Sequence, residues 1–222
     1  MQRNDDRKIW NDTYRPHLEN KFQELPWTNQ DFAEFEKVIN DISFPKNARI
    51  LDIGVGNGET SNILSKKGNV HAIDISNVAI KLVKQKYADN PRIAFATKNF
   101  SQISLKKKYD FVSCHLTIHQ VNPQEIDTWC KNIATLAKDG FSLSWLKSNS
   151  NESSRPSHCV KNHNVYHYSM EEIKQKFQGF DLKTYPDVTF EHKGRTYTYQ
   201  ILVGKKQEIP NKNKGIRAIL NL

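Results

Sequence analysis

The residues best placed to do chemistry lie in the stretch Ile-Leu-Asp-Ile-Gly-Val-Gly-Asn-Gly-Glu at residues 50–59. Gly54, Gly56 and Gly58 follow a short apolar run, and glycines at such a point allow a tight turn that a ligand can approach closely. A dinucleotide site would space its glycines as Gly-x-Gly-x-x-Gly, but Glu59 stands where the third would be. A carboxylate there would repel a pyrophosphate. The spacing therefore predicts a site for a different nucleoside cofactor.

A carboxylate on the next apolar run supports a nucleoside site. Asp74 ends the stretch Val-His-Ala-Ile-Asp at residues 70–74. At the end of a strand, a carboxylate can accept hydrogen bonds from both hydroxyls of a ribose. Asp74 alone does not distinguish a dinucleotide from another nucleoside cofactor, because the carboxylate would bind the ribose of either. The glycine spacing separates them.

The elements that must position these residues are strands alternating with helices. The expected strands span 49–54, 70–75, 92–96, 109–114 and 140–146. Such alternation predicts an α/β fold with a mostly parallel sheet and helices on both faces. After Gly179 two further strand patterns follow with no helix between them, which predicts an antiparallel edge. The total is a Rossmann-like, seven-stranded sheet.

Three helical patterns are clear. In 28–42, Phe32, Phe35, Ile39 and Ile42 fall on one stripe, which predicts an amphipathic helix before the first strand. In 122–137, Asn122 is a good N-cap and Pro123 suits the first helical position. In 169–177, Ser169 and Glu172 have the spacing of a capping box.

Composition bounds the class of protein. The chain has 222 residues, of which 37% are hydrophobic and 26% charged, as in globular domains. It contains no run long enough to cross a membrane and no apolar leader at its start. Cys114, Cys130 and Cys159 are odd in number and widely spaced, which favours a reducing compartment. We therefore expect a cytoplasmic protein with no membrane partner.

The expected organisation is a single domain over 1–206, with an N-terminal helical cap at 1–45, a core at 46–206 and a basic tail at 207–222. The polar segment 147–164 is predicted to be a long loop and a candidate lid. The formal net charge is +9. Six of these excess charges lie in the last thirty residues, so the charge favours a solvated tail over a nucleic-acid partner. The sequence does not define the oligomeric state.

These motifs together resemble the S-adenosyl-L-methionine site of class I methyltransferases. The glycine stretch and His-Ala-Ile-Asp-Ile-Ser at 71–76 resemble the cofactor loop, 109–121 resembles the fourth-strand motif, and 133–145 resembles the fifth helix–strand element. The resemblance covers about 45–204. It implies S-adenosyl-L-methionine as the cofactor and in-line methyl transfer to a small-molecule acceptor.

Two further motifs resemble a narrower group. Ile-Trp-Asn-Asp-Thr-Tyr at 9–14, Leu-Pro-Trp at 25–27 and the ending at 190–206 are similar to the tellurite-resistance and thiopurine methyltransferases. The spacing between Trp10 and Trp27 is longer than in that group, and the segment 147–164 does not align with it. The substrate is therefore not carried over.

The resemblance also implies roles for residues at the cofactor. It places three glycines beneath the methionine and ribose portions, a carboxylate under the loop that holds the amino end, and a carboxylate on the ribose. It places further residues beside the adenine and one thiol facing the methionine portion. The three glycines are Gly54, Gly56 and Gly58, the carboxylate under the loop is Asp52, and the carboxylate on the ribose is Asp74. The residues beside the adenine are Ile75, Asn99 and Phe100, and the thiol is that of Cys114.

The catalytic candidates are His115, His119 and Tyr14. The two histidines would share one face if their segment were helical, which leaves a general base or a metal role open for them. His119 is either a base or substrate contact or a packed histidine. Tyr14 either contacts the cofactor carboxylate and closes the site or packs its helix. No metal site is expected, because the cluster His158, Cys159, His163 and His167 lacks a second cysteine.

Other functions stay open. A nitrogen, oxygen or carbon acceptor would need a base such as His119. The basic tail would instead suit an RNA-binding or RNA-modifying protein, whose affinity would fall steeply with salt. A catalytically silent cofactor-binding module is a further alternative.

Overall fold

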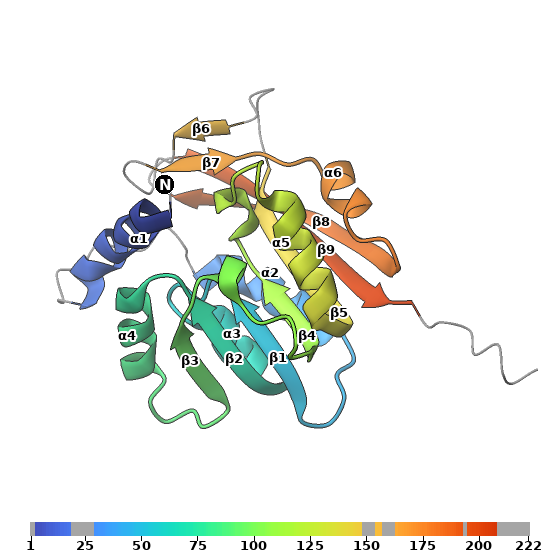
Figure 1. Ribbon diagram of the computed structural model, residues 1–222, viewed down its shortest axis with the longest axis horizontal. Helices are drawn as coiled ribbons and strands as arrows, with labels where there is room; N and C mark the ends of the chain where they lie inside the picture. The colour runs from blue at the N-terminus through green and yellow to red at the C-terminus, as the bar shows by residue number, and fades with distance from the viewer. Residues whose placement is uncertain (1–2, 19–28, 148–153, 157–162, 193–194, 208–222) are drawn as a thin grey trace, which may run out of the picture.

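The fold is built on one seven-stranded sheet. The computed structural model describes residues 3–18, 29–147, 154–156, 163–192 and 195–207 (Figure 1). The strands in spatial order are β3 (Ile93–Thr97), β2 (Gly68–Asp74), β1 (Ala48–Ile53), β4 (Tyr109–Cys114), β5 (Ala137–Leu146), β9 (Arg195–Lys206) and β8 (Phe180–His192). The first five are mutually parallel, and β9 runs antiparallel to both β5 and β8. The predicted Rossmann-like sheet is confirmed, and its antiparallel edge is the pair of β9 and the outermost β8.

Helices cover both faces of this sheet because its strands are apolar on both faces. Ile50 of β1 packs with side chains of α2 (Asn29–Asn40), α3 (Glu59–Ser65) and α4 (Asn77–Lys86). Leu51 and Ile53 of the same strand face the opposite way, toward α5 (Ile126–Leu136) and α6 (Met170–Gln175). Successive strand residues point to opposite faces, so one strand supplies both cores.

The N-terminal helix α1 (Arg3–Leu18) packs beside α4, at the left of Figure 1. Tyr14 forms a small core with Val78 and Ala79 of α4. A hydrogen bond of 2.8 Å from the Ser76 hydroxyl to Asn11 Oδ1 ties α1 to the start of α4. Helix α1 is therefore fixed above the carboxyl end of β2. None of the described helices is long and apolar enough to cross a membrane.

Two local predictions have different outcomes. The capping box is confirmed, because the Ser169 hydroxyl accepts from Glu172 N at 3.1 Å and the Glu172 carboxylate accepts from Ser169 N at 3.1 Å. Asn122 was predicted as the N-cap of α5, and this is wrong. The helix begins at Ile126 after N-cap Glu125, and Asn122 instead accepts from Gln124 N at 2.9 Å within the preceding turn.

Part of the segment predicted to be a long loop is regular. Two short strands, β6 (Ser154–Pro156) and β7 (Asn164–Tyr166), pair antiparallel in a separate sheet. The rest of the segment, 148–153 and 157–162, lies outside the described residues, as does the tail at 208–222. Strand β5 begins at Ala137, three residues before the predicted start.

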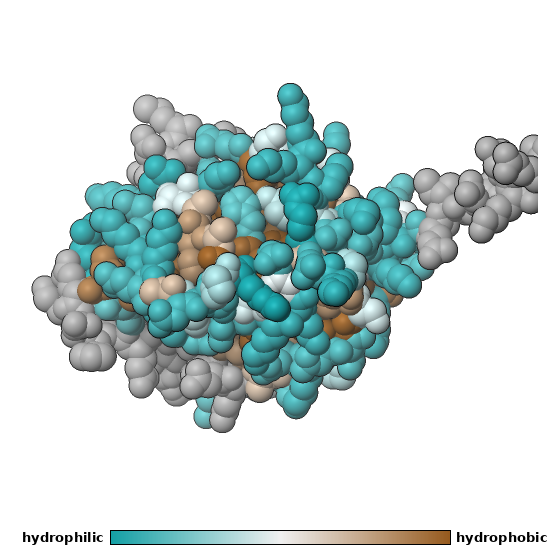
Figure 2. All heavy atoms as spheres, turned by 90° about the horizontal axis from the view of Figure 1, so that it is seen from below, coloured by the Kyte–Doolittle hydropathy of each residue, from teal (hydrophilic) through white to brown (hydrophobic). Residues whose placement is uncertain are grey.

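The surface seen from below in Figure 2 is mostly hydrophilic, with apolar side chains showing in several small separate areas. Leu105, 37% exposed, is the large hydrophobic side chain exposed among the described residues.

Candidate functional site

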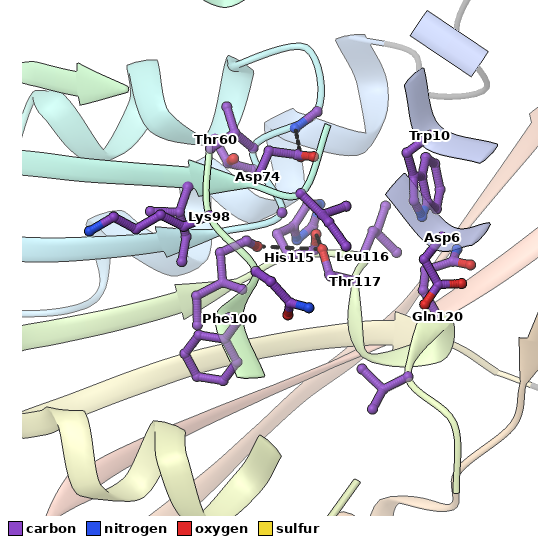
Figure 3. Close-up of a pocket in the computed structure, with 18 of the residues that line it drawn as sticks. Asp6, Trp10, Thr60, Asp74, Lys98, Phe100, His115, Leu116, Thr117 and Gln120 are labelled. Atoms are coloured by element: carbon purple, nitrogen blue, oxygen red, sulfur yellow. Dashed lines mark hydrogen bonds between the residues drawn. The ribbon is translucent and has the colours of Figure 1, made fainter. Parts of the chain in front are cut away.

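A pocket lies at the carboxyl ends of β1, β2 and β4 (Figure 3). Its walls come from the turns that follow these strands, from the segment 98–101 after β3, and from α1 above them. The strand order changes direction between β1 and β4, since β2 follows β1 on one side and β4 lies on the other. Ligands of open α/β sheets bind at such a point.

The glycine turn forms the floor of the pocket. Gly54 has φ 76° and Gly56 has φ 56°, both in the left-handed region that favours glycine. A Cβ on Gly54 would lie 2.2 Å from Thr117 Oγ1, so a side chain would separate β1 from the turn after β4. At Gly56 the nearest atom to such a Cβ would be the Tyr14 hydroxyl, at 3.0 Å. Gly56 therefore leaves the backbone open to a ligand.

Gly58 has a different role from the other two glycines. It does not line the pocket. It is the N-cap residue of α3 with φ 83°, and a Cβ there would lie 2.5 Å from the Tyr87 ring. Gly58 thus allows α3 to pack closely on α4, and only Gly54 and Gly56 meet the pocket directly.

Asp74 is fastened to the glycine turn. Its carboxylate accepts from Gly56 N at 3.1 Å and from Ser76 N at 2.8 Å. Burial raises the pKa of Asp74, and the backbone hydrogen bonds from Ser76 and Gly56 oppose that rise. Each carboxylate oxygen keeps a further lone pair at the pocket wall. The glycine turn and Asp74 are therefore joined directly at one wall of the pocket.

Asp52 lies beneath the turn and does not line the pocket. Its Oδ2 accepts from Thr60 Oγ1 at 2.9 Å and Ser61 Oγ at 2.6 Å, and its Oδ1 has no hydrogen-bond partner in the described chain. Burial raises the pKa of Asp52 to about 6, against the lowering effect of these hydroxyl groups. Asp52 thus joins β1 to α3, and its Oδ1 is a hydrogen-bond acceptor without a donor close to the glycine turn.

The residues predicted to surround an adenine come together at one end of the pocket. Ile75, Asn99 and Phe100 all line it, together with Lys98. Asn99 Oδ1 accepts from Ser101 N at 3.0 Å and so caps the short helix η1 (Phe100–Gln102). The Phe100 ring packs on Trp129 at 4.7 Å between centroids. This end, which we call the adenine end, is defined by Ile75, Lys98, Asn99 and Phe100.

His115 follows β4 and lines the pocket. The Ser144 hydroxyl lies 2.6 Å from its Nδ1 and accepts from Leu116 N at 2.9 Å. Because a hydroxyl has one proton and two lone pairs, this bond forms with the proton on either atom, according to the imidazole tautomer. Burial lowers the pKa of His115 to about 3. His115 is therefore neutral at physiological pH.

Ser144 also holds an unusual backbone. Leu116 has φ 49°, an uncommon conformation for a residue other than glycine. Its N–H group is the one that donates to Ser144. One hydroxyl on β5 thus fixes both the ring and the backbone of the turn after β4. The role of Ser144 cannot be predicted from the sequence, because Ser142 lies two residues away on the same strand and is equally buried.

Two predicted residues after β4 do not reach the pocket. His119 is buried in the short helix η2 (Ile118–Gln120), and its Nδ1 accepts from Leu146 N at 3.4 Å. The segment containing His115 and His119 is a strand end, a turn and this single turn of 3-10 helix, so the shared α-helical face does not form. Cys114 is fully buried, and burial raises the pKa of its thiol well above the usual value.

Helix α1 covers the pocket with one face. Asp6, Trp10 and Tyr14 all line it, and they are spaced four residues apart. The Tyr14 side chain is 2% exposed. Burial is the main cause that raises the pKa of its hydroxyl, and the negative charge of Asp74 raises it further. Trp10 stacks on Tyr14 at 6.2 Å and meets the edge of His163 at 5.5 Å. The four-residue spacing is the signal that could have found Asp6.

The opposite end from the adenine end, which we call the cap end, is defined by Asp6, Trp10, Tyr14, Phe32 and Gln120. Sequence reasoning missed Asp6 and Gln120, and placed Phe32 only on an apolar stripe. Among the described residues, no group of three His, Cys, Asp or Glu side chains is arranged to hold a metal ion. His158 and Cys159 lie outside the described residues.

Comparisons with known proteins identify the class of fold. Residues 50–140 match the family model described as a methyltransferase domain. A putative methyltransferase of Invertebrate iridescent virus 6 is 32% identical over 89 residues, which are 38% of this chain and 32% of that protein. An uncharacterised methyltransferase of Staphylococcus carnosus is 28% identical over 118 residues, 49% of this chain and 52% of that protein. The chain thus spans about a third to a half of these relatives.

Solved structures share the whole fold. Magnesium protoporphyrin IX methyltransferase (ChlM) from Synechocystis PCC 6803, solved with bound S-adenosylmethionine, has a TM-score of 0.66 at 16% identity, covering 93% of this chain and 98% of that one. TehB from Haemophilus influenzae has a TM-score of 0.64 at 16% identity, covering 87% of this chain and 67% of that one. The chain has the fold of class I S-adenosylmethionine-dependent methyltransferases, and it contains a match to the methyltransferase domain.

Proposed function

We propose that this protein is an S-adenosyl-L-methionine-dependent methyltransferase that acts on a small-molecule acceptor. The observation that carries the proposal is Asp74, which is hydrogen-bonded to Gly56 N at the junction of the glycine turn and the second strand. This bond holds the carboxylate beside the Gly56 backbone, which has no side chain of its own, and a carboxylate at the end of a strand can accept from the hydroxyls of a ribose.

The residues present fit the cofactor. Asp74 keeps lone pairs for two ribose hydroxyls, and Ile75 and Phe100 give apolar walls for an adenine. Asp52 lies buried under the turn with its Oδ1 unpartnered in the described chain, and we assign it to the amino end of the methionine portion through a bridging water. When bound, S-adenosylmethionine supplies an electrophilic methyl group, and the remaining task of the protein is to align the acceptor with it.

The cap end suits a small acceptor. Tyr14 and Trp10 of α1 cover this end of the pocket, and Phe32 of α2 lines the same end. Exclusion of water by such aromatic side chains strengthens polar contacts to a bound acceptor.

A narrower placement near the tellurite-resistance and thiopurine methyltransferases stays part of this proposal. The motif at 9–14 supports it, since Trp10 and Tyr14 both line the pocket. Trp27, the other part of the motif, lies outside the described residues.

Calorimetric titration with S-adenosylmethionine and S-adenosylhomocysteine tests the cofactor. A screen with methyl-labelled cofactor against thiols, chalcogen oxyanions, amines, phenols and RNA tests the acceptor. We expect both nucleosides to bind and the label to enter a small molecule. Absence of binding would refute the cofactor assignment, and label found only in RNA would refute the small-molecule acceptor.

A further inference from the structure

Helix α1 meets the two turns around Asp74 with one of its faces. Asn11 and Tyr14 are three residues apart, so their side chains lie on the same side of the helix. Asn11 bonds to Ser76 in the turn after β2, and the Tyr14 hydroxyl lies beside Gly56 in the turn after β1. Asp74 joins the same two turns, because it accepts from Ser76 N and from Gly56 N. One helix therefore spans both turns that hold this carboxylate.

Asn11 accepts two hydrogen bonds from the start of α4. Its Oδ1 accepts from the Ser76 hydroxyl at 2.8 Å and from Val78 N at 3.4 Å. Since a backbone N–H group can only donate, the oxygen of the Asn11 amide is the atom that faces α4. Ser76 is the N-cap residue of α4, and Val78 N is one of the N–H groups that a helix cannot pair at its own start. Asn11 thus supplies the missing acceptor from a different segment of the chain.

Ser76 connects Asn11 to the carboxylate. The Ser76 side chain is fully buried, and its hydroxyl donates to Asn11 while accepting from Ala79 N at 3.0 Å. Its backbone N–H group donates to Asp74 Oδ1 at 2.8 Å, and Gly56 N donates to the other oxygen at 3.1 Å. The orientation of the Asp74 carboxylate therefore depends on where Ser76 is held, and Asn11 is one of the groups that hold it.

Packing of α1 on α4 does not by itself set this position. Tyr14 packs with Val78 and Ala79, and Leu18 lies at the edge of the same small core. Apolar contacts of this kind are not directional, whereas a hydrogen bond has a preferred length and angle. The small core therefore keeps α1 on α4, and the two bonds to Asn11 fix how α1 lies against the turn after β2.

We infer that Asn11 is a positioning residue for the cofactor, which acts through Ser76 to hold Asp74 in the orientation that accepts from the ribose hydroxyls. The inference rests on the proposed function and adds a residue to the same site. Asn11 does not line the pocket, so its effect on a ligand passes through Ser76 and Asp74. Its loss should therefore weaken ligands that carry the ribose hydroxyls more than ligands that lack them.

Two nucleosides that differ only in these hydroxyls test the inference. Adenosine carries the 2′ and 3′ hydroxyls, and 2′,3′-dideoxyadenosine lacks both. The Kd of each is obtained from calorimetric titration of S-adenosylhomocysteine in its presence. In the wild type, adenosine should bind more tightly, because Asp74 accepts from its hydroxyls. In Asn11→Ala, this preference for adenosine should fall about threefold to tenfold, which is the range for loss of one neutral hydrogen bond.

The variants at Asn11 should keep their fold. Alanine favours a helix more than asparagine does, so Asn11→Ala should retain α1, and circular dichroism checks this. Asn11→Leu fills nearly the same space without a hydrogen-bond acceptor, so it provides a second measurement in which the packing volume is kept. The preference for adenosine should fall in both variants.

Two other substitutions on α1 separate positioning from a general loosening of the helix. Leu18→Ala removes a side chain from the core between α1 and α4 and leaves Asn11 intact, so it should change both Kd values by the same factor. Asp12→Ala changes a carboxylate that is 57% exposed and pairs with Arg15, so it should change neither Kd. A fall in the preference for adenosine as large in Leu18→Ala as in Asn11→Ala would overturn the inference.

The same titrations separate failure of the inference from failure of the proposed function. If the wild type prefers adenosine and both Asn11 variants keep that preference, Asn11 has no positioning role and the proposed function stands. If the wild type binds S-adenosylhomocysteine but does not distinguish the two nucleosides, Asp74 does not bind the ribose and the inference is wrong. If S-adenosylhomocysteine and S-adenosylmethionine both fail to bind, the proposed function is wrong and the inference falls with it.

Discussion

Replacement of Asp74 by alanine is the most direct test of the cofactor site. The carboxylate accepts from Gly56 N at 3.1 Å and Ser76 N at 2.8 Å, and in the proposed complex it also accepts from two ribose hydroxyls. A hydrogen bond to a charged group contributes about 1.5–3 kcal/mol. Loss of two such bonds at the lower figure costs about 3 kcal/mol, which weakens binding by roughly 100-fold or more.

Asp74→Ala should also lower stability, because it leaves two backbone N–H groups without their acceptor. Each unsatisfied group costs about 1–3 kcal/mol when buried, and less where water in the pocket can replace the carboxylate. At about 2–4 °C per kcal/mol for a chain of this size, the expected fall in Tm is several degrees. The variant should still be folded when binding is measured at 15 °C.

The assay is calorimetric titration of S-adenosylhomocysteine into each variant, with circular dichroism as a check of folding. Asp110→Ala is the matched control, because Asp110 accepts from Arg49 N at 2.7 Å near the opposite ends of β1 and β4. It should leave the Kd unchanged. A folded Asp74→Ala variant with the affinity of the wild type would refute the placement of the ribose.

Three further substitutions test the structure around the pocket. Gly54→Ala should cost more unfolding free energy than Gly179→Ala, since both have positive φ but only Gly54 has atoms within 4 Å of an added Cβ; equal losses in urea denaturation would contradict this. Ser144→Ala should cost about 1–3 kcal/mol because it leaves the buried His115 Nδ1 and the partly buried Leu116 N without their partner, whereas Ser142→Ala removes a hydroxyl without a partner and should be close to neutral. Burial raises the pKa of Asp52 from 3.8 to about 6 in the folded protein, so the protonated form is the one that folding favours. Its stabilising contribution is present below about pH 4 and lost as pH rises through about 6. Relative to Asp52→Asn, the wild type should therefore lose unfolding free energy over that range, and a flat difference would refute the shift.

The sequence predicted the parts of the site that local patterns encode. The glycine turn, Asp74, Ile75, Asn99 and Phe100 each follow a strand of the parallel sheet. Since the carboxyl ends of parallel strands meet at one edge, their order along the chain was enough to bring them together. The capping box at Ser169 was likewise local, because its donor and acceptor are three residues apart.

Other assignments failed or were missed because they depend on contacts between distant segments. The spacing of His115 and His119 suggested a common helical face, but the chain there forms a strand end and a turn. Ser144 lies 29 residues from His115, and only the pairing of β4 with β5 brings the hydroxyl to Nδ1. Nothing local distinguishes it from Ser142.

The alternation of strands and helices, the glycine turn and the carboxylate after the second strand were determined by the sequence alone. They depend on side-chain periodicity and backbone freedom, which act over a few residues. Tertiary structure decided what faces the acceptor. Packing of α1 on α4 brings Asp6 and Trp10 over the pocket, and burial keeps His115 neutral. Charge and access in a pocket are set by every element that surrounds it, so they could not be read from one segment.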